Sequence, residues 1–126
     1  MTSLILVVDD FKTARELYVR TFKAGGYDVE EAHNGPEALE KSSQREPDMV
    51  LIDIIMPGMD GWETVRRLKE QQAPRDIPIV IITGAPQPDG ARRAREAGCT
   101  YIVKPVLPEA LLRMTGEMLG HEIARS

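Results

Sequence analysis

Carboxylates follow two apolar runs of the sequence, and they are the residues best suited to hold a metal ion. Asp9 and Asp10 come directly after the run Leu4–Val8, and Asp53 closes a second run, Met49–Ile52. Apolar runs with little alternation are typical of strands in parallel sheets, which helices cover on both faces. The carboxyl ends of such strands meet at one edge of the sheet, where open α/β folds bind ligands. Because three converging carboxylates repel one another, we expect a hard cation such as Mg²⁺ beside a reactive aspartate.

The elements that must position these acids alternate between strand-like and helix-like patterns along the chain. The expected strands are Leu4–Asp9, Tyr27–Glu31, Met49–Asp53, Ile77–Ile82 and Tyr101–Val103. A helical pattern follows each strand, and Met56–Gly61, rich in glycine and proline, is expected to be a loop. This (βα)₅ order predicts an α/β fold with a doubly wound, five-stranded parallel sheet and right-handed crossovers.

Local signals predict where the helices begin and which faces they bury. Thr13 with Glu16 matches a capping box, and the segment Asn34–Glu37 supplies a cap, a first-turn proline and an early acid. Pro86 and Pro88 predict a short fourth helix, near Asp89–Ala97, because proline lacks the amide proton needed inside a helix. The expected buried faces are Ala14, Leu17, Tyr18 and Phe22 in the first helix, Trp62, Val65 and Leu68 in the third, and Leu111, Met114 and Met118 in the helix that Pro108 opens.

Length and composition limit the classes of protein that the chain can represent. Its 126 residues suit one domain with a single core, and no internal repeat or linker divides them, so residues 1–126 are expected to form a single domain. The net charge of −4 argues against direct nucleic-acid binding. The lone Cys99 excludes an internal disulfide and is compatible with a reducing cytoplasm. Leu4–Val8 is too short for a membrane span, so we expect a cytoplasmic protein without a membrane partner.

Five segments in this order resemble the receiver domain of two-component response regulators. They are LILVVDD at 4–10, GYDVEEAHNGPEAL at 26–39, DMVLIDIIMPGMDGWE at 48–63, IPIVIITG at 77–84 and YIVKP at 101–105. The stretch 53–61 follows the family pattern D-x-x-M-P-x-M-D-G closely. The resemblance covers essentially the whole chain, and it implies a flavodoxin-like sheet with strand order 2-1-3-4-5.

The resemblance also implies a role for individual residues. Asp53 would be the phosphoacceptor, which attacks a phosphohistidine of a partner protein. Asp9, Asp10, Asp53 and the backbone carbonyl of Ile55 would hold Mg²⁺ (or Mn²⁺), which keeps some of its water ligands.

Further residues would bind the phosphoryl group or signal its presence. Thr83 would donate its hydroxyl to a phosphoryl oxygen, and the ammonium of Lys104, aimed by a cis bond to Pro105, would pair with Asp53 and then with the phosphate. Thr83 and Tyr101 would form the switch, with Tyr101 filling the space that Thr83 vacates. A tyrosine fixed in one rotamer is the alternative interpretation of Tyr101, and packing is the alternative for Thr83.

These residues together favour a stand-alone receiver domain rather than a turnover enzyme. Its partners would be a sensor histidine kinase or a histidine phosphotransfer protein, and a downstream effector protein. The fourth helix, fifth strand and fifth helix form the expected docking face and a possible homodimer interface. A phosphorelay shuttle, or a receiver excised from a hybrid kinase, shares all of this chemistry and remains an alternative.

Two less similar functions use related topologies. A flavin-binding electron carrier needs a phosphate-cradling loop after the first strand, where this chain has the acidic Asp9 and Asp10. An aspartate-based phosphohydrolase usually needs a second acid two residues after its nucleophile, where this chain has Ile55. Since neither Ile55 nor Ala85 can orient an attacking water, we also predict slow autodephosphorylation.

Overall fold

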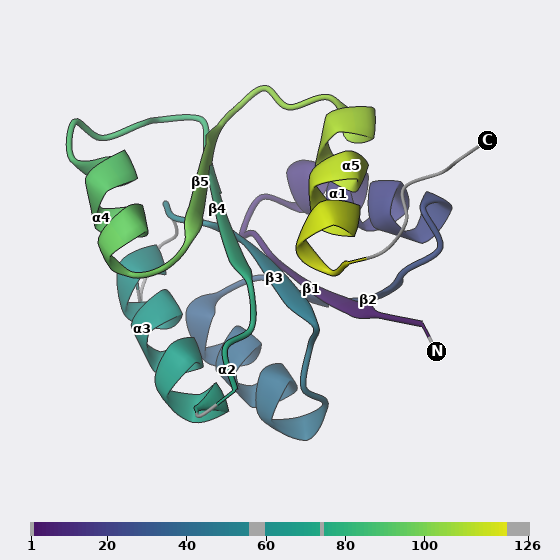
Figure 1. Cartoon of the computed structure of the whole chain (residues 1–126), viewed down its shortest axis with the longest axis horizontal. Coiled ribbons are helices and arrows are strands. Elements are labelled where there is room, and N and C mark those ends of the chain that lie inside the picture. The colour runs from purple at the N-terminus through teal and green to yellow at the C-terminus, as the bar shows by residue number, and fades with distance from the viewer. Residues whose placement is uncertain (1, 56–59, 74, 121–126) are drawn as a thin grey trace.

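Five parallel strands form one sheet, with helices on both of its faces (Figure 1). The strand order is β2-β1-β3-β4-β5, which confirms the predicted doubly wound, five-stranded fold. In chain order the elements are β1 (Leu4–Val8), α1 (Lys12–Ala24), β2 (Asp28–Ala32), α2 (Gly35–Gln44), β3 (Met49–Asp53), α3 (Gly61–Gln72), β4 (Ile79–Thr83), α4 (Gly90–Glu96), β5 (Thr100–Val103) and α5 (Pro108–Met118).

The computed structural model describes residues 2–55, 60–73 and 75–120. Most of the loop expected at Met56–Gly61 lies outside these residues, because the description resumes only at Asp60. Within the described ranges, no helix is long and apolar enough to cross a membrane.

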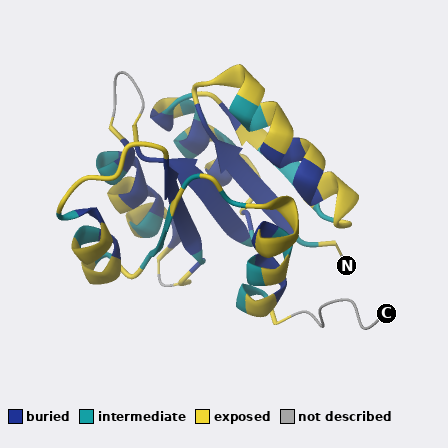
Figure 2. Ribbon diagram, turned by 90° about the horizontal axis from the view of Figure 1, so that it is seen from above, coloured by how far each residue is buried: buried dark blue, intermediate teal, exposed yellow. Residues whose placement is uncertain are grey.

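The three central strands explain the apolar runs that the sequence showed. Every residue of β1, β3 and β4 is buried, because helices pack on both faces of the sheet at these positions (Figure 2). The edge strands β2 and β5 are more exposed, and β2 carries the charged residues Glu30 and Glu31. Burial on both sides therefore removes the alternation that a sheet with one wet face would show.

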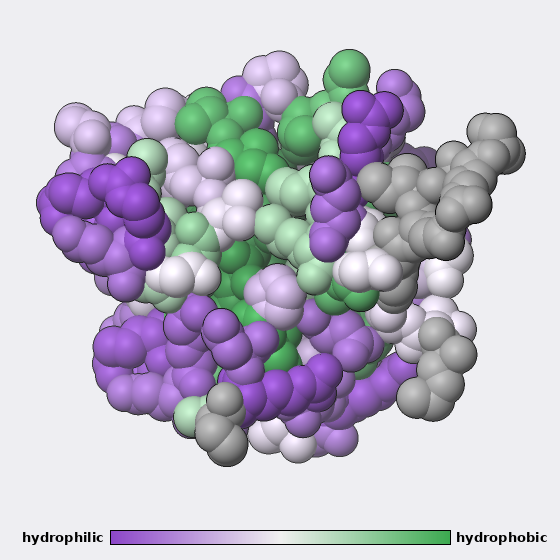
Figure 3. Space-filling view, in the orientation of Figure 1, coloured by the Kyte–Doolittle hydropathy of each residue, from purple (hydrophilic) through white to green (hydrophobic). Residues whose placement is uncertain are grey.

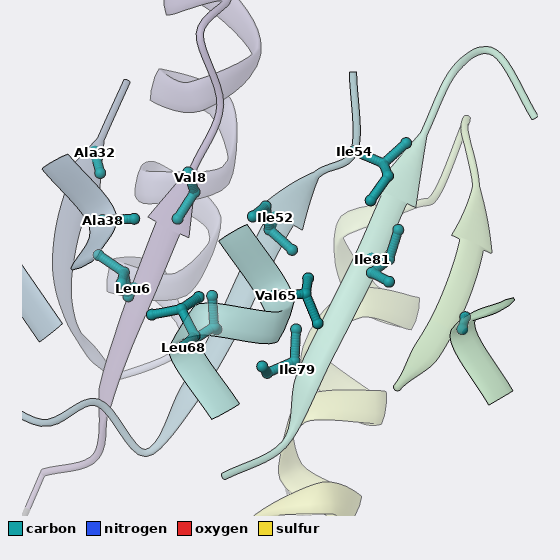
Figure 4. Close-up of a cluster of buried hydrophobic side chains, with 12 residues drawn as sticks. Leu6, Val8, Ala32, Ala38, Ile52, Ile54, Val65, Leu68, Ile79 and Ile81 are labelled. Carbon is teal, nitrogen blue, oxygen red and sulfur yellow. The ribbon is translucent and has the colours of Figure 1, made fainter. Parts of the chain in front are cut away.

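Two hydrophobic clusters hold the helices on the sheet. On one face, α2, α3 and α4 pack on alternate strand residues through Ala38, Val65, Leu68 and Ala94 (Figure 4). On the other face, α1 and α5 pack through Phe22 and Leu111, among others. Alternate side chains of each central strand point to opposite faces, so each strand contributes to both clusters.

Several local predictions are confirmed. The side chain of Asn34 caps α2 by accepting the Glu37 amide, and Pro108 lies at the first turn of α5. The helix α4 has only seven residues, as the two prolines before it predict. Gly98, with a φ of 73°, follows this helix in the left-handed conformation that glycine adopts most easily.

The predicted beginning of α1 is wrong, and so is one residue of its buried face. The helix begins at Lys12, and no side chain caps it, so Thr13 lies inside the first turn rather than at a capping box. The reason is that the Asp9 side chain accepts the amide of Phe11, which turns the chain into the helix earlier. Leu17 is 48% exposed, whereas Val19 is buried in its place.

Several strand boundaries also differ from the prediction, by one or two residues each, and only β3 matches at both ends. The strand β4 begins at Ile79 rather than Ile77, because Pro78 has no amide to donate to the ladder. The strand β2 begins at Asp28, because the amide of Tyr27 still donates to Phe22 at the end of α1.

Candidate functional site

The sheet brings four of the predicted residues together at its carboxyl edge. Asp9 follows β1, Asp53 ends β3, Thr83 ends β4 and Lys104 follows β5. The strands β1 and β3 are neighbours, and the chain order of the sheet reverses between them. Open α/β sheets bind ligands at such a reversal, so the cluster lies where the fold favours a site.

Lys104 joins the acidic side chains at this edge. Its Nζ lies 3.3 Å from Oδ2 of Asp53 and 3.9 Å from Oδ2 of Asp9. The Lys104 amide donates to the carbonyl of Thr83 at 2.8 Å, which holds the backbone of the lysine against the end of β4. The Lys104–Pro105 peptide bond that follows is cis. One ammonium therefore neutralises part of the charge of two carboxylates from different strands.

The same local turn fixes the side chain after each of the three central strands. Oδ1 of Asp9 accepts the amide of Phe11 at 2.9 Å, and Oδ1 of Asp53 accepts the amide of Ile55 at 2.9 Å. The hydroxyl of Thr83 accepts the amide of Ala85 at 3.1 Å. In both aspartates, one oxygen is thus bound to the backbone and the other faces Lys104.

Burial makes the Asp9 carboxylate costly to keep charged. Asp9 is 1% exposed, and burial raises its pKa; the neighbouring charge of Asp53 raises it further, while the Phe11 amide and Lys104 lower it. Its Oδ2 atom is buried without a hydrogen-bond partner within the described part of the chain. An unpaired, buried carboxylate oxygen is stabilised by a bound cation.

The acidic residues fit a divalent cation only in part. Asp9 and Asp53 each place one carboxylate oxygen within 3.9 Å of Nζ of Lys104, whereas Asp10 is exposed. Within residues 2–55, 60–73 and 75–120, no three His, Cys, Asp or Glu side chains are arranged as a metal site. A magnesium ion often takes only one or two protein carboxylates and fills its other positions with water. The orphaned oxygen of Asp9 and the nearby carboxylate of Asp53 are compatible with that ligand set.

Lys104 is held in the charged state at this site. Its burial lowers the pKa of the ammonium, but interaction with Tyr18, Asp53 and Asp9 raises it more, so the net direction is upward. The side chain of Lys104 is 27% exposed and that of Asp53 is 12% exposed. The pair can therefore be reached from solvent without being fully hydrated.

Tyr101 is half-buried and packs against the beginning of α4. A Cβ atom added at Gly90 would overlap the hydroxyl of Tyr101, so the tyrosine lies directly over this glycine. Thr83 is fully buried. Tyr101 and Thr83 lie on adjacent strands, since β4 pairs with β5 in parallel.

Sequence reasoning missed two residues of α1 that contact this site. The ring of Tyr18 has its centroid 5.9 Å from Nζ of Lys104. Arg15 donates to the carbonyl of Asp9 at 2.9 Å and to Glu31 at 2.9 Å. The sequence placed Tyr18 only in a hydrophobic face, and its hydroxyl was the one signal of a polar neighbour.

One arginine of α4 packs against α3. The guanidinium of Arg93 lies 4.3 Å from the ring centroid of Trp62, a cation–π contact with α3. The indole of Trp62 donates to the Gln87 side chain at 3.4 Å, which ties the loop before α4 to the same helix.

Comparison with known proteins identifies the family. The model of the response regulator receiver domain matches residues 5–115. Since the match covers most of the chain, the chain belongs to the response regulator receiver domain family. Receiver domains are signalling switches and are generally not turnover enzymes.

Relatives differ in how much of their length this chain covers. The Pseudomonas aeruginosa phosphate regulon transcriptional regulatory protein PhoB is 37% identical over 120 residues, which are 89% of this chain but only 52% of PhoB. The Brucella ovis polar-differentiation response regulator DivK is 30% identical over 121 residues, covering 95% of this chain and 98% of DivK. The structure of the Vibrio cholerae chemotaxis protein CheY4 has a TM-score of 0.86 and 32% identity, and covers 94% of this chain and 99% of CheY4.

Proposed function

We propose that this chain is a phosphorylatable switch in which Asp53 accepts a phosphoryl group from a phosphohistidine. The observation that carries the proposal is the distance of 3.3 Å between Nζ of Lys104 and Oδ2 of Asp53, at the carboxyl edge of a receiver sheet. In the reaction, the Asp53 carboxylate oxygen forms a bond to phosphorus as the bond between phosphorus and the histidine nitrogen breaks. The Lys104 ammonium would pair with the charge that gathers on the phosphoryl oxygens.

Asp9, Asp10, Asp53 and the carbonyl of Ile55 are the proposed ligands of Mg²⁺ or Mn²⁺. The buried, unpaired Oδ2 of Asp9 supports this ligand set. When bound, the ion supplies positive charge that offsets the phosphoryl oxygens. The three turns at Asp9, Asp53 and Thr83 keep the reactive side chains in place for it.

The proposed switch uses the hydroxyl of Thr83 and the ring of Tyr101. A phosphoryl group adds about −1.5 to −2 charges and three acceptor oxygens, and the Thr83 hydroxyl would turn toward them. Tyr101 would then leave Gly90 and move into the space that Thr83 vacates. Taking an inactive state from 99% to 1% requires about 5.5 kcal/mol, which several charge-assisted hydrogen bonds to a phosphate can approach.

An apolar rim supports docking of a phosphodonor protein at this edge. Three apolar residues in the loops beside the site are exposed: Phe11 (65%), Ile55 (49%) and Leu107 (67%). Phe11 lies in the loop after β1, Ile55 in the loop after β3, and Leu107 in the loop that follows Lys104. Hydrophobic residues gather along the top of Figure 3, over the loop between β5 and α5. Exposed apolar groups around a polar centre are typical of protein interfaces.

The proposed phosphodonor of this chain, itself proposed to be cytoplasmic, is a sensor histidine kinase or a histidine phosphotransfer protein. The proposed recipient of the signal is an effector protein that docks on α4, β5 and α5, a face that can also serve a homodimer. DivK is a relative whose own length corresponds to this domain, since the chain covers 98% of it. A shuttle in a phosphorelay uses the same site and differs only in passing the phosphoryl group on.

Intact mass after incubation with Mg²⁺ and acetyl phosphate tests the proposal. We expect the wild type to gain the mass of one phosphoryl group, the Asp53→Asn variant to gain none, and chelation of Mg²⁺ to prevent the gain. Asp76→Asn is the control, because that side chain is 89% exposed and far from the cluster in the sequence and in its contacts. Equal phosphorylation of the wild type and Asp53→Asn would contradict the assignment of the phosphoacceptor.

A further inference from the structure

We infer that Tyr18 is a positioning residue that holds the ammonium of Lys104 inside the site. This inference rests on the proposed function, in which Lys104 pairs with Asp53 and with the incoming phosphoryl group. Tyr18 lies on α1, and neither its position nor its residue type belongs to the segments on which the family resemblance rests.

The contact between Tyr18 and Lys104 is direct. The ring centroid lies 5.9 Å from Nζ, and the ammonium lowers the pKa of the Tyr18 phenol against the larger, raising effect of burial. Tyr18 is 7% exposed and belongs to the hydrophobic cluster that α1 shares with α5. The ring is therefore fixed by packing, while its oxygen faces a charge.

Three groups surround the Lys104 ammonium, and only one of them is hydrogen-bonded to it. Oδ2 of Asp53 lies 3.3 Å from Nζ and accepts its hydrogen bond, whereas Oδ2 of Asp9 lies at 3.9 Å. The third is Tyr18 of α1, whose ring centroid lies 5.9 Å from Nζ. The first two carry charge and come from the sheet, whereas Tyr18 is neutral and comes from a helix that covers it.

A neutral partner has a different effect from a third carboxylate. It restrains the long, flexible side chain of Lys104, which loses considerable rotamer freedom when held. It does so without reducing the positive charge that the phosphoryl oxygens would meet. Tyr18 thus prepares the position of the ammonium before the phosphodonor arrives.

The kinetic test compares Tyr18→Phe with the wild type in the rate of phosphorylation by acetyl phosphate. Phenylalanine keeps the packed ring and removes only the oxygen, so we expect the rate to fall about fivefold, the factor that corresponds to one ordinary polar interaction. Tyr27→Phe is the matched control, because Tyr27 packs edge-on against Phe22 of the same helix, with ring centroids 6.2 Å apart. We expect that control to keep the wild-type rate.

A double-mutant cycle separates positioning from a general effect on the fold. If Tyr18 acts through Lys104, adding Tyr18→Phe to Lys104→Met changes the rate no further. An equal fivefold loss in both backgrounds, or no loss in either, would overturn the inference.

Nitrogen-15 NMR of the lysine ammonium gives a readout that does not depend on phosphorylation. We expect a signal that Lys104→Met removes, that Tyr18→Phe shifts or broadens, and that Tyr27→Phe leaves unchanged. An unchanged signal in Tyr18→Phe would overturn the positioning role. A wild type that takes up no phosphoryl group but shows the expected NMR changes would instead refute the proposed function and leave the contact established.

Discussion

Replacing Asp9 by asparagine should stabilise the protein in the absence of metal. Asparagine keeps an oxygen to accept the Phe11 amide and removes the buried charge. The Asp9 residue is 1% exposed, and its Oδ2 has no hydrogen-bond partner within the described ranges. Leaving a buried group unsatisfied costs about 1–3 kcal/mol, and more when the group is charged, so a neutral amide at this position lowers the cost.

One interaction opposes this gain. The Asp9 carboxylate lies 3.9 Å from Nζ of Lys104, and the variant loses this attraction, which the raised pKa of Asp9 indicates is smaller than the cost of burial. Lys104 keeps its closer partner, Asp53, at 3.3 Å. The net expectation is a free energy of unfolding about 1–2 kcal/mol higher, which corresponds to an increase in Tm of roughly 3–10 °C.

The pH dependence of this difference has a defined sign. Burial raises the pKa of Asp9 above its ordinary value of 3.8, so the folded state binds the proton more tightly than the unfolded state. The destabilisation of the wild type is therefore complete above the raised pKa and disappears as the pH falls below 3.8. The advantage of Asp9→Asn should be largest at neutral pH and should close on acidification.

Urea unfolding in the presence of a chelator, at neutral and acidic pH, measures both effects. Asp10→Asn is the matched control, because this neighbouring acid is exposed and its substitution should change stability by less than about 0.5 kcal/mol. Asp9→Asn and Asp10→Asn with equal stabilities at neutral pH would refute the reasoning, since only the buried Asp9 carboxylate is expected to destabilise the wild type.

Four further outcomes follow from the structure. Mg²⁺ should raise the Tm of the wild type in a concentration-dependent way, because an ion that binds only the folded state stabilises it by mass action. The increase should be smaller for Asp53→Asn, and equal increases of Tm in calorimetry would exclude Asp53 from the metal site. Gly61→Ala should lower the free energy of unfolding in urea by about 1–3 kcal/mol, because the added Cβ would lie 2.5 Å from the backbone of Ile54. In Gly84→Ala the added Cβ would lie 3.6 Å from the Lys104 side chain, so that variant should have nearly the wild-type stability. The phosphoryl group should remain on Asp53 for far longer than seconds, because Ile55 and Ala85 cannot orient water; phosphate release within seconds would contradict this. Burial raises the pKa of Glu37, but His33 and Lys41 lower it more, so the net direction is downward. Glu37→Gln should therefore lower the free energy of unfolding by up to about 1 kcal/mol above pH 4.5, and by nothing once the pH falls below the lowered pKa. Thermal melts across pH measure this difference.

The topology was predictable because the central strands are buried on both faces. Their apolar runs carry no alternation, and the helical patterns between them leave only parallel crossovers. The convergence of Asp9 and Asp53 follows from the same logic, since strand ends in one parallel sheet share an edge, whereas the place of Lys104 beside them was implied by the family resemblance. The distances from Nζ of Lys104 to the carboxylates of Asp9 and Asp53 could not be predicted from local sequence, because these side chains lie far apart in the chain.

What could not be predicted depends on how a helix is rotated over the sheet. Tyr18 and Leu17 are adjacent apolar residues, and only the packing of α1 decides that Tyr18 is buried beside Lys104 and Leu17 is exposed. The first turn of α1 was similarly hidden, because Asp9, a predicted metal ligand, also fixes the amide of Phe11.

The contact between Trp62 and Arg93 gives this protein an internal optical probe. Trp62 is the only tryptophan of the sequence, and its ring touches both the guanidinium of α4 and the side chain of Gln87 in the loop before that helix. Indole emission responds to a nearby charge and to hydration, so a displacement of α4 would change the fluorescence without any attached dye. The proposed docking face can therefore be followed in solution, in real time, in the unmodified chain.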